Sequence, residues 1–358
     1  MDVWVKQGIV TAISDVSTDK QELTVMVGTE YAKAINFPLL TGMCEVGDQV
    51  ILNTTAVELQ LGTGGYHFVM GIIGKNYTPE QKLGHLMKVR YTPSQGRVLS
   101  VEEEDSPYHE IIAQASDIAG LPVIVGSLHS MLGPVCLGFK HVAPQRRLVY
   151  LMSDGAALPL ALSNLVDQLT NLRLLDSTIT FNHAFGGDYE AVNVYSALLT
   201  AKHVCNADAA VILMGPGVVG TGTTWGTTAV EQGIFLNAVH TLKGNAIAIP
   251  RISLADQRYR HQGISHHTLT ALSVIAEHPS HVPIPQALQT HSIIQSQLAY
   301  LKKHHLHWIA TENYRHLLEH SPVSLRSMGR DFNADPYFFE TALAAGLFVG
   351  WQYADTIE

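Results

Sequence analysis

The chain has 358 residues, of which 22 are Lys or Arg and 31 are Asp or Glu, so its formal net charge is −9. This length predicts two domains, and the acidic balance argues against a general nucleic-acid or membrane surface. Three cysteines lie far apart, which excludes a disulfide framework or a cysteine-rich zinc site and favours a cytoplasmic protein.

The sequence also argues against export and against a membrane partner. Its first residues contain no apolar leader, and no apolar run approaches the ~20 residues that span a bilayer.

Residues 1–78 are expected to form a small all-β, barrel-like domain, because short β-rich runs alternate there with turn signals. The runs are 3–13, 22–27, 31–35, 49–53 and 66–73. The LGTGG segment at 61–65 lies between two of them, and its glycines predict a bulge or a bend rather than a phosphate cradle.

Residues 79–358 are expected to form a Rossmann-like, mainly parallel α/β sandwich, because strand-like apolar runs alternate with helix-length segments. The runs are 122–126, 148–152, 178–181, 209–214 and 246–250. Ligands of such sheets bind beyond the carboxyl ends of the strands, so we expect the polar residues after each run to converge on one crevice. These residues are Ser127, His129, Ser153, Asp154, Asn182, His183, Arg251, Ser253 and Asp256.

A glycine-rich turn follows the fourth run, and its glycines permit backbone angles that let peptide N–H groups converge on an anion. The predicted ligand-binding residues are Gly215, Gly217, Gly220, Gly222, Thr221, Thr223, Thr224 and Arg251. The spacing matches the dinucleotide fingerprint only formally, because the next strand ends at Arg251 rather than at an acidic residue and no P-loop lysine is present. A tight turn that needs glycine for its geometry alone is the other interpretation.

Two aspartates after strands have alternative interpretations. Asp188 is expected to cap the helix that follows it. Asp154 either caps a helix or acts as a general base or metal ligand.

The densest polar segment follows the fifth run and carries Asp256, His261, His266 and His267. His266 and His267 are expected in the first turn of a helix, where they act in catalysis or bind phosphate. Metal binding is the alternative, because these two histidines together with His261 could hold a divalent ion, although their spacing matches no zinc pattern.

The C-terminal region is expected to be helical from about His291, with several of its histidines on the surface, and Trp308 and Ile309 are candidates for the start of another strand. The apolar helix 338–349 has Ala and Gly on one face, which indicates packing inside the domain or a dimer contact.

Three segments together resemble an uncharacterised bacterial family, domain of unknown function 3866. They are LGTGG at 61–65, GPGVVGTGTTWG at 215–226 and RISLADQRYRHQGISHHT at 251–268. The resemblance implies a bacterial, cytoplasmic protein and carries over no catalytic residue and no cofactor.

The leading hypothesis is an enzyme that binds a small phosphorylated, anionic or nucleotide-like ligand at 215–224 and performs group transfer or hydrolysis. Its predicted catalytic residues are His266, His267, Asp256 and Asp154. The alternative is a non-catalytic metabolite sensor or assembly factor, and a nucleic-acid-binding protein ranks third because of the charge. A homodimer is expected in either case.

Overall fold

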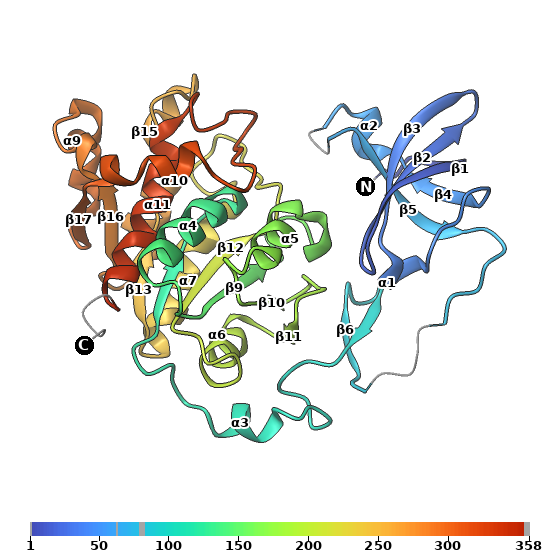
Figure 1. The fold of residues 1–358 in the computed structure, drawn as a ribbon, viewed down its shortest axis with the longest axis horizontal. Helices are drawn as coiled ribbons and strands as arrows, with labels where there is room; N and C mark the ends of the chain where they lie inside the picture. The colour runs from blue at the N-terminus through green and yellow to red at the C-terminus, as the bar shows by residue number, and fades with distance from the viewer. Residues whose placement is uncertain (1, 62–63, 79–82, 354–358) are drawn as a thin grey trace. The chain divides into compact units, whose positions relative to one another are not determined.

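The computed structural model describes residues 2–61, 64–78 and 83–353. It divides the chain into two compact units, Met1–Leu99 and Ser100–Glu358. The first contains a closed five-stranded barrel and the second an eight-stranded parallel sheet with helices, which confirms a mixed α/β fold with a barrel (Figure 1). The boundary predicted near Thr78 lies inside the first unit. This unit extends to Leu99 because it also includes the two-stranded sheet of β6 (Leu86–Lys88) and β7 (Gly96–Val98).

The barrel closes in the order β1-β2-β3-β5-β4. Its strands are β1 (Val5–Val16), β2 (Gln21–Val27), β3 (Glu30–Asn36), β4 (Gln49–Asn53) and β5 (Tyr66–Ile72), with short helices α1 (Pro38–Thr41) and α2 (Thr55–Glu58). Alternate side chains of β2 point inward, as the period of a strand requires, and Leu23 and Val25 pack there with Val10 and Val50. The bulge predicted at 61–65 includes residues 62 and 63, which lie outside the described residues.

The sheet of the second unit has the order β11-β10-β9-β12-β8-β13-β16-β17, and every pairing in it is parallel. Its strands are β8 (Pro122–Val125), β9 (Leu148–Ser153), β10 (Ser177–Phe181), β11 (Tyr189–Ala191), β12 (Ala209–Met214), β13 (Asn245–Ala248), β16 (His281–Pro285) and β17 (His305–Ile309). The five runs expected from the sequence correspond to β8, β9, β10, β12 and β13.

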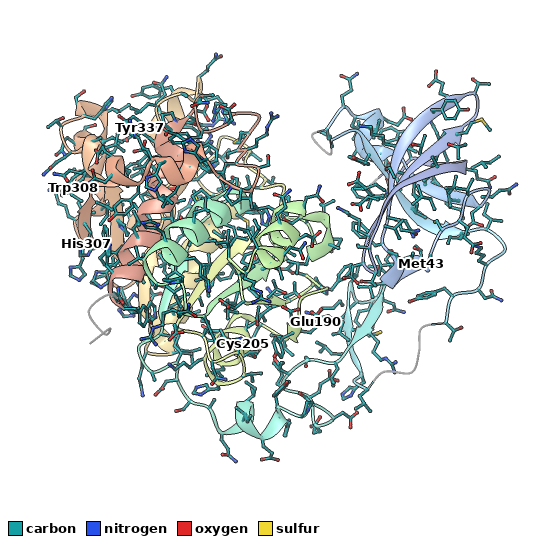
Figure 2. The ribbon with its side chains drawn as sticks, in the orientation of Figure 1. Met43, Glu190, Cys205, His307, Trp308 and Tyr337 are labelled. Carbon is teal, nitrogen blue, oxygen red and sulfur yellow. The ribbon has the colours of Figure 1, made fainter. Side chains whose placement is uncertain are left out.

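The last two strands of this sheet correct the expected C-terminal helix. The helix α9 (Ser292–Leu298) continues as a 3-10 turn to Leu301, and the chain then enters β17, which carries His307 and Trp308 (Figure 2). His304, expected on the surface, is buried, and its Nδ1 accepts a hydrogen bond from Ser280 N. The prolines of β16 and the histidines of β17 have low strand propensity, so the local sequence does not clearly predict these two strands.

Helices cover both faces of the sheet. The long ones are α4 (Leu132–Val142), α5 (Asn164–Asn171), α6 (Val194–His203), α7 (Glu231–Thr241) and α11 (Pro336–Trp351), and the short ones are α3 (His109–Gln114), α8 (His266–Thr270) and α10 (His316–Glu319). Side chains of α4, α5 and α11 share one core with Ile124, and those of α6 and α7 share the other core with Val123 and Val125. Adjacent residues of a strand point to opposite faces, so α4 and α7 lie on opposite sides of the sheet.

The small residues of α11 serve packing inside the unit. A Cβ on Gly138 of α4 would lie 2.6 Å from the carbonyl oxygen of Leu343, and one on Gly346 would meet the carbonyl of Val135. The two helices therefore approach backbone to backbone (Figure 1). Among the described residues, no helix has both the length and the apolar character needed to cross a bilayer.

A crevice is expected where β8 and β12 lie side by side. The chain leaves β8 for α4 on one face and leaves β12 for α7 on the other. In open parallel sheets, ligands bind at the carboxyl ends of such neighbouring strands.

Candidate functional site

A cavity of about 100 Å³ lies at the carboxyl ends of β8, β12 and β13. Its lining comes from the loop after each of these strands, from the histidine segment and from a C-terminal loop. The lining residues are Ser127, Leu128, Val218, Val219, Gly220, Ala229, Arg251, Arg258, His261, His267 and Met328. Residues that follow three of the five predicted strands therefore meet in one place.

A short antiparallel pair shapes the histidine segment. Strand β14 (Ile252–Ser253) pairs with β15 (Gly263–Ile264) and folds the intervening loop back on itself. The 3-10 turn Tyr259–His261 closes this loop, and the helix α8 begins directly after β15. His261 is thereby brought to His266 and His267, which lie in the first turn of α8 as predicted.

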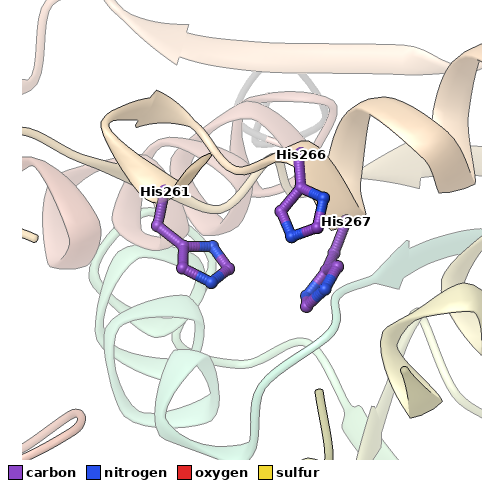
Figure 3. A group of neighbouring side chains, drawn as sticks. All are labelled: His261, His266 and His267. Atoms are coloured by element: carbon purple, nitrogen blue, oxygen red, sulfur yellow. The ribbon is translucent and has the colours of Figure 1, made fainter. Parts of the chain in front are cut away.

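The three histidine rings point into one space (Figure 3). Each offers a ring nitrogen, and these three atoms lie within 4.8 Å of one another. The ring centroids of His266 and His267 are 3.9 Å apart, and each lies 5.2 Å from that of His261. A π-helix, Ala271–Ile275, continues α8, and such turns occur often at functional sites.

Burial keeps these histidines neutral. His261 and His267 are 2% and 6% exposed, and their pKa values are lowered to about 3 and about 4, first by loss of solvation and then by Arg251 for His261 and by His266 and Arg251 for His267. The pKa of His266 is lowered too, first by burial and then by Arg260. At neutral pH all three are uncharged imidazoles, which can accept a proton or donate a lone pair but make poor general acids.

The hydrogen bonds of the cluster are incomplete. Ser265 Oγ lies 2.8 Å from Nδ1 of His261, Arg251 Nη1 lies 3.4 Å from the same nitrogen, and Thr227 Oγ1 lies 3.4 Å from Nδ1 of His267. Among the described residues, the buried Nε2 atoms of His266 and His267 have no hydrogen-bond partner. Buried polar atoms in folded proteins normally have hydrogen-bond partners, so these two ring nitrogens without partners indicate a binding site.

An arginine network lies beside the histidines. Asp256 accepts hydrogen bonds from Arg251 at 3.0 Å and from Arg258 at 2.8 Å, and Arg330 lies 3.5 Å from it. The Arg258 side chain is the largest cause of the lowered pKa of Asp256. The carboxylate therefore stays ionised with its oxygens occupied, which suits holding arginines in place better than the predicted acid–base role.

A second carboxylate anchors the C-terminal loop to this network. Asp335 accepts hydrogen bonds from Ser253 Oγ at 2.7 Å and from Arg330 Nε at 3.0 Å. Nothing local in the sequence marks Arg330 or Met328 as neighbours of Asp256, because more than seventy residues separate them.

Arg260 differs from the other arginines. It is exposed, it lies over Gly222, and within the described parts of the chain it makes no hydrogen bond or ion pair. Arg251, Arg258 and Arg330 pair with Asp256 and Asp335, and Arg260 acts on the neighbouring His266, so among these six charged residues the four positive charges exceed the two negative ones by two. This positive site belongs to a chain whose net charge is −9.

The loop 215–224 contributes geometry to this site. Gly217 and Gly222 have φ of +105° and +85°, which other residues rarely adopt. A Cβ on Gly220 would lie 2.7 Å from Cε1 of His267, so only glycine lets the loop approach that ring. A Cβ on Gly215 would lie 2.6 Å from the carbonyl oxygen of Ala157.

The loop threonines bond within the loop. Thr221 Oγ1 donates to the carbonyl of Gly226 at 2.9 Å, and Gly226 N donates to Thr223 Oγ1 at 3.0 Å, while Thr224 is exposed. The helix α7 begins only at Glu231, whose carboxylate occupies its first turn and accepts from Ser153 Oγ at 2.8 Å. These contacts favour the interpretation of the loop as a turn that requires glycine, and its anion cradle stays a prediction.

Asp154 has other partners than the histidines. Its two oxygens accept from Asn182 Nδ2 at 3.0 Å and from His183 N at 3.1 Å, so it links the ends of β9 and β10. The helix α5 is capped by Ser163 instead. The predicted catalytic role of Asp154 finds no support in these contacts and stays a prediction.

Asp188 caps no helix, contrary to expectation. Asp188 accepts from Thr178 N and Oγ1 at 2.8 and 3.0 Å, and Asn193 caps α6 with a capping box. A three-residue strand, β11, stands between Asp188 and α6, and the sequence pattern does not reveal it.

A comparison with known protein families identifies the family of this chain. The family model described as a protein of unknown function, DUF3866, matches residues 33–346, which confirms the resemblance seen in the sequence. The match covers parts of both compact units. No curated protein gives a significant match.

Proposed function

Because this chain belongs to DUF3866, a family of proteins of unknown function, the site itself has to indicate the activity, and we propose an enzyme that acts on a phosphorylated, anionic substrate. The substrate's charged group enters the cavity at the ends of β8, β12 and β13. The reaction is hydrolysis or group transfer. The Rossmann-like reading of the parallel sheet belongs to this proposal, because its ligands bind at that edge.

The main evidence for this proposal is the excess of two positive charges among the arginines and aspartates of the site. Arg251 and Arg258 are partly neutralised by Asp256, whereas the guanidinium of Arg260 is exposed and unpaired among the described residues. A planar guanidinium matches a phosphate or carboxylate with two parallel hydrogen bonds. Arg260 is therefore the first contact for the substrate, and Asp256 holds the arginines behind it.

The size of the cavity limits what enters it. A volume of about 100 Å³ is well below the roughly 300–1,000 Å³ of pockets that enclose whole ligands. Only a phosphoryl or similar group fits, and the rest of a nucleotide-like substrate would stay outside. His266 and His267, as neutral imidazoles, offer ring-nitrogen lone pairs that can hold an electrophile beside that group.

The test combines ligand binding with turnover. We expect phosphorylated ligands to raise the unfolding temperature of the protein and their dephosphorylated counterparts to leave it unchanged. A ligand at a hundred times its dissociation constant stabilises by about 2.7 kcal/mol, which corresponds to several degrees. Release of inorganic phosphate or of a leaving group from each ligand that binds then reports turnover.

A pair of variants tests the role of Arg260. Arg260→Gln should lose the thermal shift, because Arg260 lies beside His266 and Gly222 at the site, whereas Arg173→Gln removes the same charge from an exposed residue after α5 and should keep it. Loss in both variants, or in neither, contradicts the proposed contact. Binding without turnover of any ligand supports the metabolite-sensor function instead.

The cellular setting is part of the proposal. All three cysteines are buried and unpaired, which suits a reducing bacterial cytoplasm. A homodimer stays a prediction that sedimentation of the purified protein checks.

A further inference from the structure

We propose that His261, His266 and His267 form a binding site for one divalent transition-metal ion of the zinc type. Nothing in the family match assigns a metal, and metal binding itself does not depend on the phosphorylated substrate proposed above. The inference rests on the geometry, burial and unsatisfied nitrogens of the three rings.

The geometry is close to that of a three-histidine site. Zinc–nitrogen bonds of about 2.0–2.1 Å in a tetrahedron place the nitrogens about 3.3 Å apart. The three ring nitrogens lie within 4.8 Å of one another, so small ring rotations close the site without moving the backbone. Two ligands come from the first turn of α8 and the third from the loop that the β14–β15 pair folds back, so the site is built from one continuous segment.

The hydrogen bond of His267 leaves the correct nitrogen for the metal. Thr227 Oγ1 donates to Val219 O at 2.8 Å, so it accepts from Nδ1 of His267 at 3.4 Å. That bond places the proton on Nδ1 and the lone pair on the buried Nε2. Nδ1 of His261 lies 2.8 Å from Ser265 Oγ and 3.4 Å from Arg251 Nη1, which can only donate, so the proton of this ring has to pass from Nε2 to Nδ1, where Ser265 Oγ can accept it, before Nε2 binds a metal. Metal-ligating histidines nearly always have such an outer hydrogen bond.

An ordinary core role does not explain these rings. Within the described residues, Nε2 of His266 and Nε2 of His267 are buried and have no hydrogen-bond partner. The side chain of His267 is only 6% exposed, so solvent does not readily supply a partner. Core histidines normally have both nitrogens satisfied, as His304 does through Ser280 and Leu272. A lone pair on neutral imidazole repels an anion and attracts a cation, so the arginines and the histidines bind different species.

Three protein ligands leave a fourth position. Catalytic zinc sites have this arrangement, in which water completes the tetrahedron, whereas structural sites use four protein ligands. Because His261 and His267 line the cavity together with Arg251 and Arg258, a water on the metal would face the place proposed for the substrate's charged group.

The experiment uses the full-length protein, stripped with a chelator and studied without substrate. Titration with Co²⁺ should give one equivalent of binding with the intense visible bands of a tetrahedral nitrogen site, and Zn²⁺ should displace it. Competition against a chromophoric chelator gives the Zn²⁺ dissociation constant. Failure of the substrate proposal leaves this result unchanged, because no phosphorylated ligand is present.

Variants locate the ion. His267→Ala and the size-conserving His266→Gln should each weaken Zn²⁺ binding at least 100-fold, with circular dichroism and the metal-free unfolding temperature reporting that both fold. His307→Ala is the matched control, because His307 belongs to another histidine pair, in which its Nε2 lies 2.8 Å from Nδ1 of His281. The proposal is overturned if the wild type binds no stoichiometric metal, or if His307→Ala abolishes binding that His267→Ala retains.

Discussion

Replacing Gly220 with alanine tests whether the loop 215–224 shapes the histidine site. The added methyl carbon would lie 2.7 Å from Cε1 of His267, whereas ordinary carbon contacts are about 3.5–4.0 Å. The ring or the loop must therefore move by about 0.8 Å or more. The methyl group would thereby restrict the ring rotation that brings His267 to metal-binding distance, so the bond of His267 to the metal should weaken.

The expected effect falls on the metal and spares the fold. Gly220 is exposed and its φ is not positive, so alanine fits the backbone there, and the unfolding free energy should change by less than about 1 kcal/mol. The affinity for Zn²⁺ should fall about 10- to 100-fold, the range seen when the support of a metal ligand is disturbed. Competition titration of the full-length protein measures this change.

Gly217→Ala is the control in the same loop. Its added methyl meets no atom within 4 Å, although its φ of +105° strains the backbone. It should destabilise the loop and keep the Zn²⁺ affinity within a factor of about three. The reasoning is refuted if Gly220→Ala binds Zn²⁺ like the wild type, or if both variants lose affinity equally.

Two further predictions concern anion coupling and pH. Inorganic phosphate should tighten Zn²⁺ binding, because a bound anion offsets the two excess positive charges, and Arg260→Gln should reduce this gain in paired titrations; equal gain in both proteins contradicts the coupling. Burial lowers the pKa of His129 from 6.5 to about 4, so below about pH 6.5 the unfolded chain binds a proton that the folded chain takes up only near pH 4. The contribution of His129 to the free energy of unfolding is complete above pH 6.5 and decreases as the pH falls towards 4. Because the ring keeps some solvent contact, we expect about 2–3 kcal/mol of the free energy of unfolding to be lost by pH 4. Urea unfolding at pH 7 and pH 4.5 should show a weaker pH dependence in His129→Gln, and an unchanged dependence would exclude this ring as its source.

The fold could be predicted where residue patterns follow the period of the element. Buried parallel strands such as β9 and β12 are continuous apolar runs, and the strands of the barrel alternate with turns, so both are visible in the sequence. The strand β16 was missed and β17 was expected only at Trp308 and Ile309, because Pro283 and the histidines of β17 contradict local propensity and pairing within the sheet stabilises both strands.

The candidate site was predicted in part. The position of His266 and His267 in the first turn of a helix followed from the sequence, because Ser265 and the apolar spacing after it mark where α8 begins. Residues after β8, β12 and β13 converge as the rule for parallel sheets requires. Asp154 follows β9 but binds Asn182 and His183, because each side chain takes the partner nearest in space.

The sequence thus determined where the apolar strands and the start of α8 lie along the chain, because burial and backbone preference act on neighbouring residues. The tertiary structure alone decided which of these residues meet. The β14–β15 pair brings His261 to His266, and a loop more than seventy residues away brings Arg330 to Asp256. Such contacts depend on the closure of long loops, whose ends no local pattern specifies.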